Sequence, residues 1–147
     1  MFPLEKQKIC NLLFFVDQEV ENRLIEEVEE FIQGLAASRE WLLGPPVFVN
    51  EGGEEDDYPY TLGGLFRLYS SYAPAKLPKD VDRIHLEEVK EILRQVQRFS
   101  EEKQIVFCFE LDQDQIGWIE KGVVDELMQL SLLDEWERVL QGEEDAG

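Results

Sequence analysis

Two stretches with helical periodicity, each placed between strand-like stretches, constrain the fold of this chain more than any other feature. In both stretches the apolar residues recur at steps of three and four, which is typical of a helix that buries one stripe against a core. The first set is Val20, Leu24, Val28, Phe31, Ile32 and Leu35, and the second is Leu86, Val89, Ile92, Leu93, Val96 and Phe99. The sequence therefore predicts two long amphipathic helices.

Strand-like stretches rich in β-branched and aromatic residues surround these helices. They cover 9–16, 47–49, 60–70 and 104–111, and 116–120 is expected to return as the second strand of a hairpin. Gly63-Gly64 indicates a bulge or a close approach of two backbones. The order strand, helix, strand, strand, helix, strand is that of the ferredoxin-like split βαβ fold, here with an added hairpin strand and a C-terminal helix. An α+β sheet with another strand order is the alternative, because periodicity does not reveal strand order.

Polar residues mark where the helices are expected to begin. Asp17 is a candidate N-cap for the first helix, and Asp80 or Asp82 for the second. Ser131, followed three residues later by Asp134, resembles a capping box before a last helix. A length of 147 residues with 44% hydrophobic side chains predicts one α+β domain over 1–142 and a disordered acidic tail over 143–147.

Charge is distributed unevenly along the chain. The 33 acidic and 14 basic residues give a formal net charge of −19. Residues 17–57 hold 13 acidic and two basic residues, a balance of −11, and residues 101–147 hold 14 and three, again −11. Residues 66–100 hold five acidic and seven basic residues, a balance of +2. Such a chain would be repelled by bare nucleic acid and by an anionic membrane, so neither is an expected partner.

Cys10 and Cys108 each lie inside an apolar stretch and are expected to be inert core thiols. If the first and fourth strands are neighbours, the two thiols come close together, and a redox pair or a nucleophile is the alternative. No C-x-x-C spacing and no adjacent basic residue supports that alternative. The longest apolar run near the start, 9–16, is too short to span a bilayer, so we expect a cytoplasmic protein.

Metal and catalytic motifs are weak. His85, the only histidine, is expected at the surface or boundary of the second helix rather than as a general base, and two cysteines cannot complete a structural zinc site. Asp112, Asp114 and Gly117 resemble the start of a calcium loop, but a hairpin turn explains them better, because two ligand positions of that loop are apolar here. The sequence predicts no metal, no cofactor and no enzymatic activity.

The acidic segments suggest instead a small module that captures a basic protein. Acidic immunity or inhibitor proteins that bind cationic toxins, and proteins that mimic DNA, offer an analogy in charge and size. The expected partner-binding residues are Glu26, Glu29, Glu30, Glu51, Glu54, Glu55, Asp56, Asp57 and Tyr58. The alternatives are a ligand-binding or regulatory ferredoxin-like domain, a carboxylate-dependent enzyme, and acidity that only keeps the chain dissolved. The sequence does not predict an oligomeric state.

Overall fold

A six-stranded antiparallel sheet organises the chain in the computed structural model, which describes residues 8–52, 61–69 and 78–146. The strands lie in the order β2-β3-β1-β4-β5-β6. They are β1 (Ile9–Val16), β2 (Val47–Glu51), β3 (Thr61–Tyr69), β4 (Val106–Leu111), β5 (Asp114–Glu120) and β6 (Val123–Val124). The helices are α1 (Asn22–Ala37), α2 (Lys79–Lys103), α3 (Glu126–Met128), the π-helical segment η2 (Gln129–Asp134) and α4 (Glu135–Ala146). The prediction of an α+β fold is confirmed.

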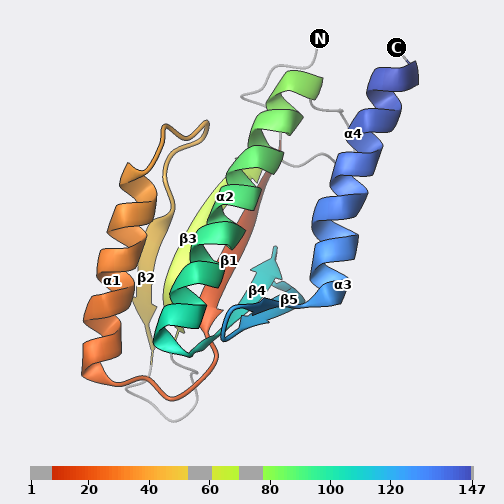
Figure 1. Ribbon diagram of the computed structural model, residues 1–147. Coiled ribbons are helices and arrows are strands. Elements are labelled where there is room, and N and C mark those ends of the chain that lie inside the picture. The colour runs from red at the N-terminus through yellow and green to blue at the C-terminus, as the bar shows by residue number, and fades with distance from the viewer. Residues whose placement is uncertain (1–7, 53–60, 70–77, 147) are drawn as a thin grey trace.

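One face of the sheet carries the core, because α1 and α2 lie side by side across it (Figure 1). Side chains alternate between the two faces along a strand, and the even-numbered residues of β1, among them Leu12, Phe14 and Val16, are the buried ones. Phe31 of α1 stacks on Phe99 of α2 with ring centroids 4.4 Å apart. The apolar stripes predicted for the two helices therefore meet each other as well as the sheet.

Gly63 and Gly64 allow β1 and β3 to approach closely. A Cβ atom at Gly63 would lie 1.9 Å from the carbonyl oxygen of Phe14, and one at Gly64 would lie 2.5 Å from the ring of Phe14. The pairing of β3 with β1 continues through both glycines without a register shift. Of the two readings of this dipeptide, the close approach of backbones is the correct one, and there is no bulge.

The cysteines are far apart, although β1 and β4 are neighbours. Cys108 pairs with Phe15, five residues along β1 from Cys10, which corresponds to about 17 Å at the rise of a strand. Odd and even positions of β1 also face opposite sides of the sheet. The expectation that the two thiols come close together is therefore wrong, and neither cysteine forms a disulfide.

The predicted helix caps are wrong in detail. α1 begins at Asn22, with Glu21 at the N-cap position, so Asp17 does not cap it. α2 begins at Lys79 after Pro78, and Asp80 and Asp82 fall in its first turn. In both cases a carboxylate near a helix start is used elsewhere: Asp17 accepts a hydrogen bond from the Cys108 thiol at 3.3 Å, and Asp82 accepts one from Trp136 Nε1 at 2.8 Å.

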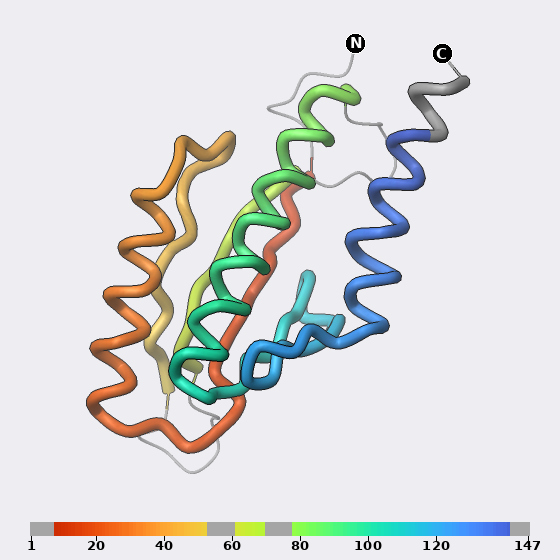
Figure 2. The backbone as a smooth tube through the Cα atoms, viewed as in Figure 1, coloured from red at the N-terminus to blue at the C-terminus, as the bar shows by residue number. Residues whose placement is uncertain are grey.

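The C-terminal segment forms one continuous helical run from α3 through η2 to α4, which lies beside α2 (Figure 2). Asp125 caps this run, since its side chain accepts a hydrogen bond from the Leu127 amide. The capping box expected at Ser131 is wrong, because Ser131 lies inside η2 and its hydroxyl donates to the carbonyl of Leu127. α4 extends through residues 143–146, which fall in the segment that sequence analysis treats as a tail.

Candidate protein-binding surface

The outer side of α1 presents three of the predicted partner-binding carboxylates. Glu26, Glu29 and Glu30 are exposed, while Val28, Ile32 and Leu35 on the other side of the helix are buried. Within the described residues none of the three glutamates has an ion pair. Their spacings of three and four residues place like charges next to one another, which costs about 0.2–0.5 kcal/mol per pair. The fold therefore keeps a mildly repulsive cluster on this helix, and we call these three residues the α1 acidic face.

The neighbouring Glu27 of the same helix, in contrast, has its charge neutralised by two basic residues. Its carboxylate contacts Lys103 Nζ at 2.6 Å and Arg23 Nε at 3.2 Å. The hydrogen bond from Lys103 is the main reason why the pKa of Glu27 is lowered, and the charge and hydrogen bond of Arg23 add to it. Because Arg23 is the only basic residue of α1, it is not available to the α1 acidic face.

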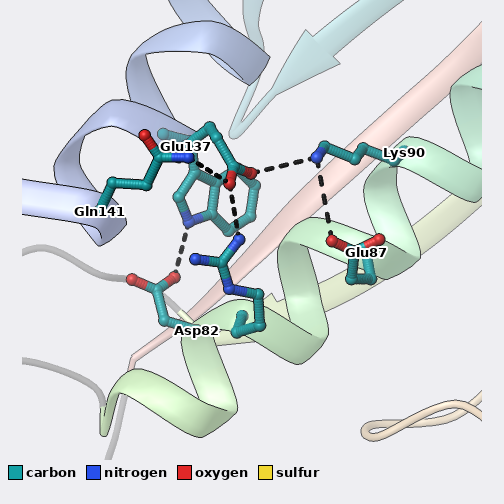
Figure 3. A network of polar contacts seen from close by, with 7 residues as sticks. Asp82, Glu87, Lys90, Glu137 and Gln141 are labelled. Atoms are coloured by element: carbon teal, nitrogen blue, oxygen red, sulfur yellow. Dashed lines mark hydrogen bonds and ion pairs between the residues drawn. The ribbon is translucent and has the colours of Figure 1, made fainter. Parts of the chain in front are cut away.

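Carboxylates between α2 and α4 are also paired with cations (Figure 3). Glu137 of α4 lies between Arg83 Nη1 at 2.8 Å and Lys90 Nζ at 3.1 Å, both from α2. Hydrogen bonds from these two cations lower the pKa of Glu137 to about 2. Along the helices, Glu91 pairs with Arg94 and Glu135 with Arg138. We call the contact of Glu137 with Arg83 and Lys90 the α2–α4 seam.

Of the other predicted partner-binding residues, the structure describes only Glu51. Glu51 is exposed at the last position of β2, at the end of the sheet where α1 begins (Figure 1). The remaining five lie outside the described residues, namely Glu54, Glu55, Asp56, Asp57 and Tyr58. The structure therefore locates four of the nine residues, three on α1 and Glu51 on β2, and their role in binding stays a prediction.

The second face of the sheet carries an apolar surface that no helix covers in the described parts of the chain, and sequence reasoning missed it; we call it the open face. Leu13 and Phe15 of β1 point away from the helices, and Leu13 pairs with Leu65 on β3 and with Glu110 on β4. Both leucines are partly exposed and lie outside the core cluster. The signal was present in the sequence: a strand that is apolar at consecutive positions, LLFFV, indicates that both of its faces avoid water, whereas the predicted helices cover only one.

A hollow of about 340 Å³ lies on this open face. Its lining comes from three adjacent strands and the turn after β4: Asn11, Leu13, Leu65, Glu110, Asp112 and Gln113. The turn is a two-residue hairpin loop in which Asp112 and Gln113 both have positive φ, as a type I′ turn requires. Asp112 accepts a hydrogen bond from the Asn11 amide at 2.8 Å, which fixes this turn against β1. The hairpin reading of this segment is confirmed.

His85 belongs to a buried polar network, so the prediction of a surface or boundary histidine is wrong. His85 and Glu88 are both fully buried, with Nδ1 and Oε1 2.9 Å apart. The Tyr69 amide donates to His85 Nε2, so Nε2 is the acceptor and Nδ1 carries the proton that reaches Glu88. The second oxygen of Glu88 accepts from the Leu42 amide at 2.8 Å. Position 85 in fact continues the apolar stripe, four residues after Val81 and four before Val89.

This network has a structural role. It joins α2 to β3 through Tyr69 and to the segment between α1 and β2 through Leu42. Both ring nitrogens of His85 are engaged, which leaves neither free to take a proton from a substrate.

The Cys108 thiol is protected from ionisation. Burial, followed by the hydrogen bond to Asp17, raises its pKa to about 11. A thiol with such a pKa is protonated near neutrality and is a poor nucleophile. The described residues contain no group of three or more histidine, cysteine or acidic side chains arranged to hold a metal ion.

In the same parts of the chain, every helix is too short or too polar to cross a bilayer. Comparison with protein-family models, with curated proteins and with solved structures gives no match.

Proposed function

We propose that this protein is a binding module that captures a basic protein partner through the α1 acidic face. Immunity or inhibitor proteins against cationic toxins, and proteins that mimic DNA, represent this class of function. The observation that supports the proposal most strongly is the contrast in pairing. Glu26, Glu29 and Glu30 are exposed without an ion pair in the described part of the chain, whereas Glu27 and Glu137 are each held by two cations.

The unpaired carboxylates have a physical use in such a module. A surface field of one sign raises the association rate with an oppositely charged protein by about 10- to 1,000-fold at low ionic strength. A carboxylate already neutralised by lysine or arginine adds little to that field, because its own cation cancels it beyond a few ångströms. Glu51 at the end of β2 adds a fourth exposed carboxylate near the start of α1.

Capture from native cells tests the proposal. The wild-type protein is compared with a variant that neutralises the α1 acidic face, Glu26→Gln with Glu29→Gln and Glu30→Gln. The matched control removes three charges from paired carboxylates, Glu87→Gln with Glu91→Gln and Glu135→Gln. Glu87 is paired as well, since its Oε1 lies 3.8 Å from Lys90 Nζ. We expect wild type and control to retain a basic protein at about 50 mM salt and to release it at about 500 mM, and the α1 variant to retain none. A partner that is acidic, or that the α1 variant retains equally, contradicts the proposal.

We also propose that β1 to β4, with α1 and α2, form a ferredoxin-like unit to which β5, β6 and the C-terminal helices are added. The placement of β1 between β3 and β4, with α1 following β1 and α2 following β3, supports this assignment. Backbone amide contacts from β1 to both β3 and β4 in solution are the test, and a β1 with a single neighbour contradicts it. Two cysteines that form no disulfide agree with a reducing, cytoplasmic location, which fractionation of native cells tests.

A further inference from the structure

We propose that the hollow on the open sheet face receives an arginine or lysine side chain of the basic partner. This inference rests on the proposed function and gives that partner a second contact, on the side of the sheet opposite the helices. The hollow combines two properties that such a side chain needs, an apolar wall for its stem and carboxylates for its cationic end.

The apolar wall comes from a row of paired residues across three strands. Leu65 of β3 pairs with Leu13 of β1, which pairs with Glu110 of β4, so the three side chains share one face. Leu13 and Leu65 are only partly buried and lie outside the core. The methylene stem of a long cationic side chain can therefore cover surface that the described residues leave uncovered.

The carboxylates come from the same row and from the turn beside it. Glu110 pairs directly with Leu13, and Asp112 is anchored through the Asn11 amide. Neither has an ion pair in the described part of the chain. Two carboxylates at one hollow suit a guanidinium group, which can donate to both, better than they suit a single ammonium.

Among the described residues, Arg67 is the cation on this face that could compete for the two carboxylates, since it pairs with Asn11 on β1. Its Nη2 instead donates to the carbonyl of Leu43 at 3.3 Å, in the segment that precedes β2. β2 lies beyond β3 from β1 and β4, so this contact draws the guanidinium away from Glu110. The described residues therefore leave the hollow with negative charge.

Charge also favours a cationic partner over a second copy of this chain as the occupant. Two copies packed through their sheets would bring together two molecules that each carry a formal charge of −19. A basic partner instead gains from the same field that guides it to the α1 acidic face. A dimer formed through the open face is therefore a distinct outcome, and it is measured in the experiment below.

A titration with side-chain analogues tests the inference without knowledge of the partner. n-Butylguanidinium is added to the full chain and followed through backbone amide NMR shifts, with n-butylammonium and the neutral n-butylurea as comparisons. We expect saturable shifts at the amides of Asn11, Leu13 and Leu65, weaker binding of butylammonium, and none of butylurea. Equal binding of the urea, shifts confined to α1, or no saturable shift overturns the inference.

Two variants locate the interaction. Glu110→Gln removes the carboxylate with little change of shape and is expected to weaken butylguanidinium binding about tenfold. Glu120→Gln makes the same change at the exposed last residue of β5 and is expected to alter binding less than about twofold. Unchanged binding in Glu110→Gln contradicts the inference, as does sedimentation that shows a dimer whose formation excludes the analogue.

The α1 triple variant separates this inference from the proposed function. It is expected to bind butylguanidinium as wild type does while it loses the captured partner. If the α1 variant captures the partner as wild type does while the analogue still binds at the hollow, the proposed role of α1 is contradicted and the inference about the hollow is supported. If the analogue does not bind while the α1 variant still loses the partner, the inference about the hollow is contradicted and the proposed function is supported.

Discussion

The two acidic segments of the chain carry the same formal balance of −11, and the fold treats one group of carboxylates from each of them differently. In α1, Glu26, Glu29 and Glu30 are exposed and have no ion pair in the described residues. At the α2–α4 seam, Glu137 is held by Arg83 and Lys90 of the nearly neutral middle segment. Charge counted along a sequence therefore does not give charge at a surface, because tertiary contacts decide which carboxylates receive a cation. The comparison divides the acidic residues into two groups. The carboxylates of one group make ion pairs or hydrogen bonds within the fold, and those of the other group are exposed without such a contact in the described residues.

The largest expected effect comes from the buried carboxylate of Glu88. Glu88→Ala leaves the His85 Nδ1 proton and the Leu42 amide without acceptors, and should lower the free energy of unfolding by about 3–5 kcal/mol. Urea denaturation measures it. Glu87→Ala, at an exposed position beside it on the same helix, is the control and should change stability by less than about 1 kcal/mol. Equal effects would mean that burial does not distinguish the two glutamates.

The next effect concerns the pH dependence of stability at the α2–α4 seam. The folded-state pKa of Glu137 is about 2, below its ordinary value, so the unfolded chain binds more protons as the solution is acidified. The stabilisation from Glu137 is present above its ordinary pKa and is lost as the pH falls from about 4.5 through about 2. Thermal unfolding of Glu137→Gln should accordingly show a shallower loss of stability in that window than wild type. Parallel curves would contradict the pairing at the seam.

A smaller effect is expected from Asp17, whose carboxylate accepts a hydrogen bond from the Cys108 thiol. In a Cys10→Ala background, Asp17→Asn should lower the pKa of Cys108 from about 11, because the charge and the accepted hydrogen bond both disfavour the thiolate. The pKa should stay above its ordinary value, since burial is the largest cause of the shift. Thiolate absorbance against pH measures it. An unchanged pKa of Cys108 would contradict the hydrogen bond between its thiol and the Asp17 carboxylate.

The smallest expected effect is on the stability of the α1 acidic face itself. Neutralising Glu26, Glu29 and Glu30 together should leave the free energy of unfolding within about 0.5–1 kcal/mol of wild type, with a slight gain from reduced repulsion. Urea denaturation and circular dichroism check this. A large loss of stability would place these carboxylates in the group that makes contacts within the fold, and would remove the structural argument for a binding role.

The elements of the fold could be predicted from local pattern, whereas the contacts of particular side chains could not. The stripes of α1 and α2 and the hairpin after β4 follow from spacing and turn chemistry, both of which are local. Asp17 and Asp82 look like caps in the sequence, but each accepts a hydrogen bond from a residue more than 50 positions away. The burial of His85 depends likewise on the Tyr69 amide that β3 brings to it.

The same limit applies to the candidate surface. The glutamates of α1 could be placed on its outer side from the helical spacing alone, and the structure agrees. The hollow on the sheet could not be found in this way, because it needs the register that aligns Leu65, Leu13 and Glu110 across three strands. Register depends on pairing between distant segments and shifts every side chain to the other face when it slips by one residue.

The association rate of the captured basic partner is the most direct measurement of the central claim. Stopped-flow fluorescence at about 20 mM and about 300 mM salt should show a rate for wild type, and for the Glu87/Glu91/Glu135 control, that falls steeply with salt. The variant with glutamine at positions 26, 29 and 30 should associate at least about tenfold more slowly at low salt and depend little on salt. Equal rates and equal salt dependence for the two triple variants would show that net charge, rather than the unpaired carboxylates of α1, attracts the partner.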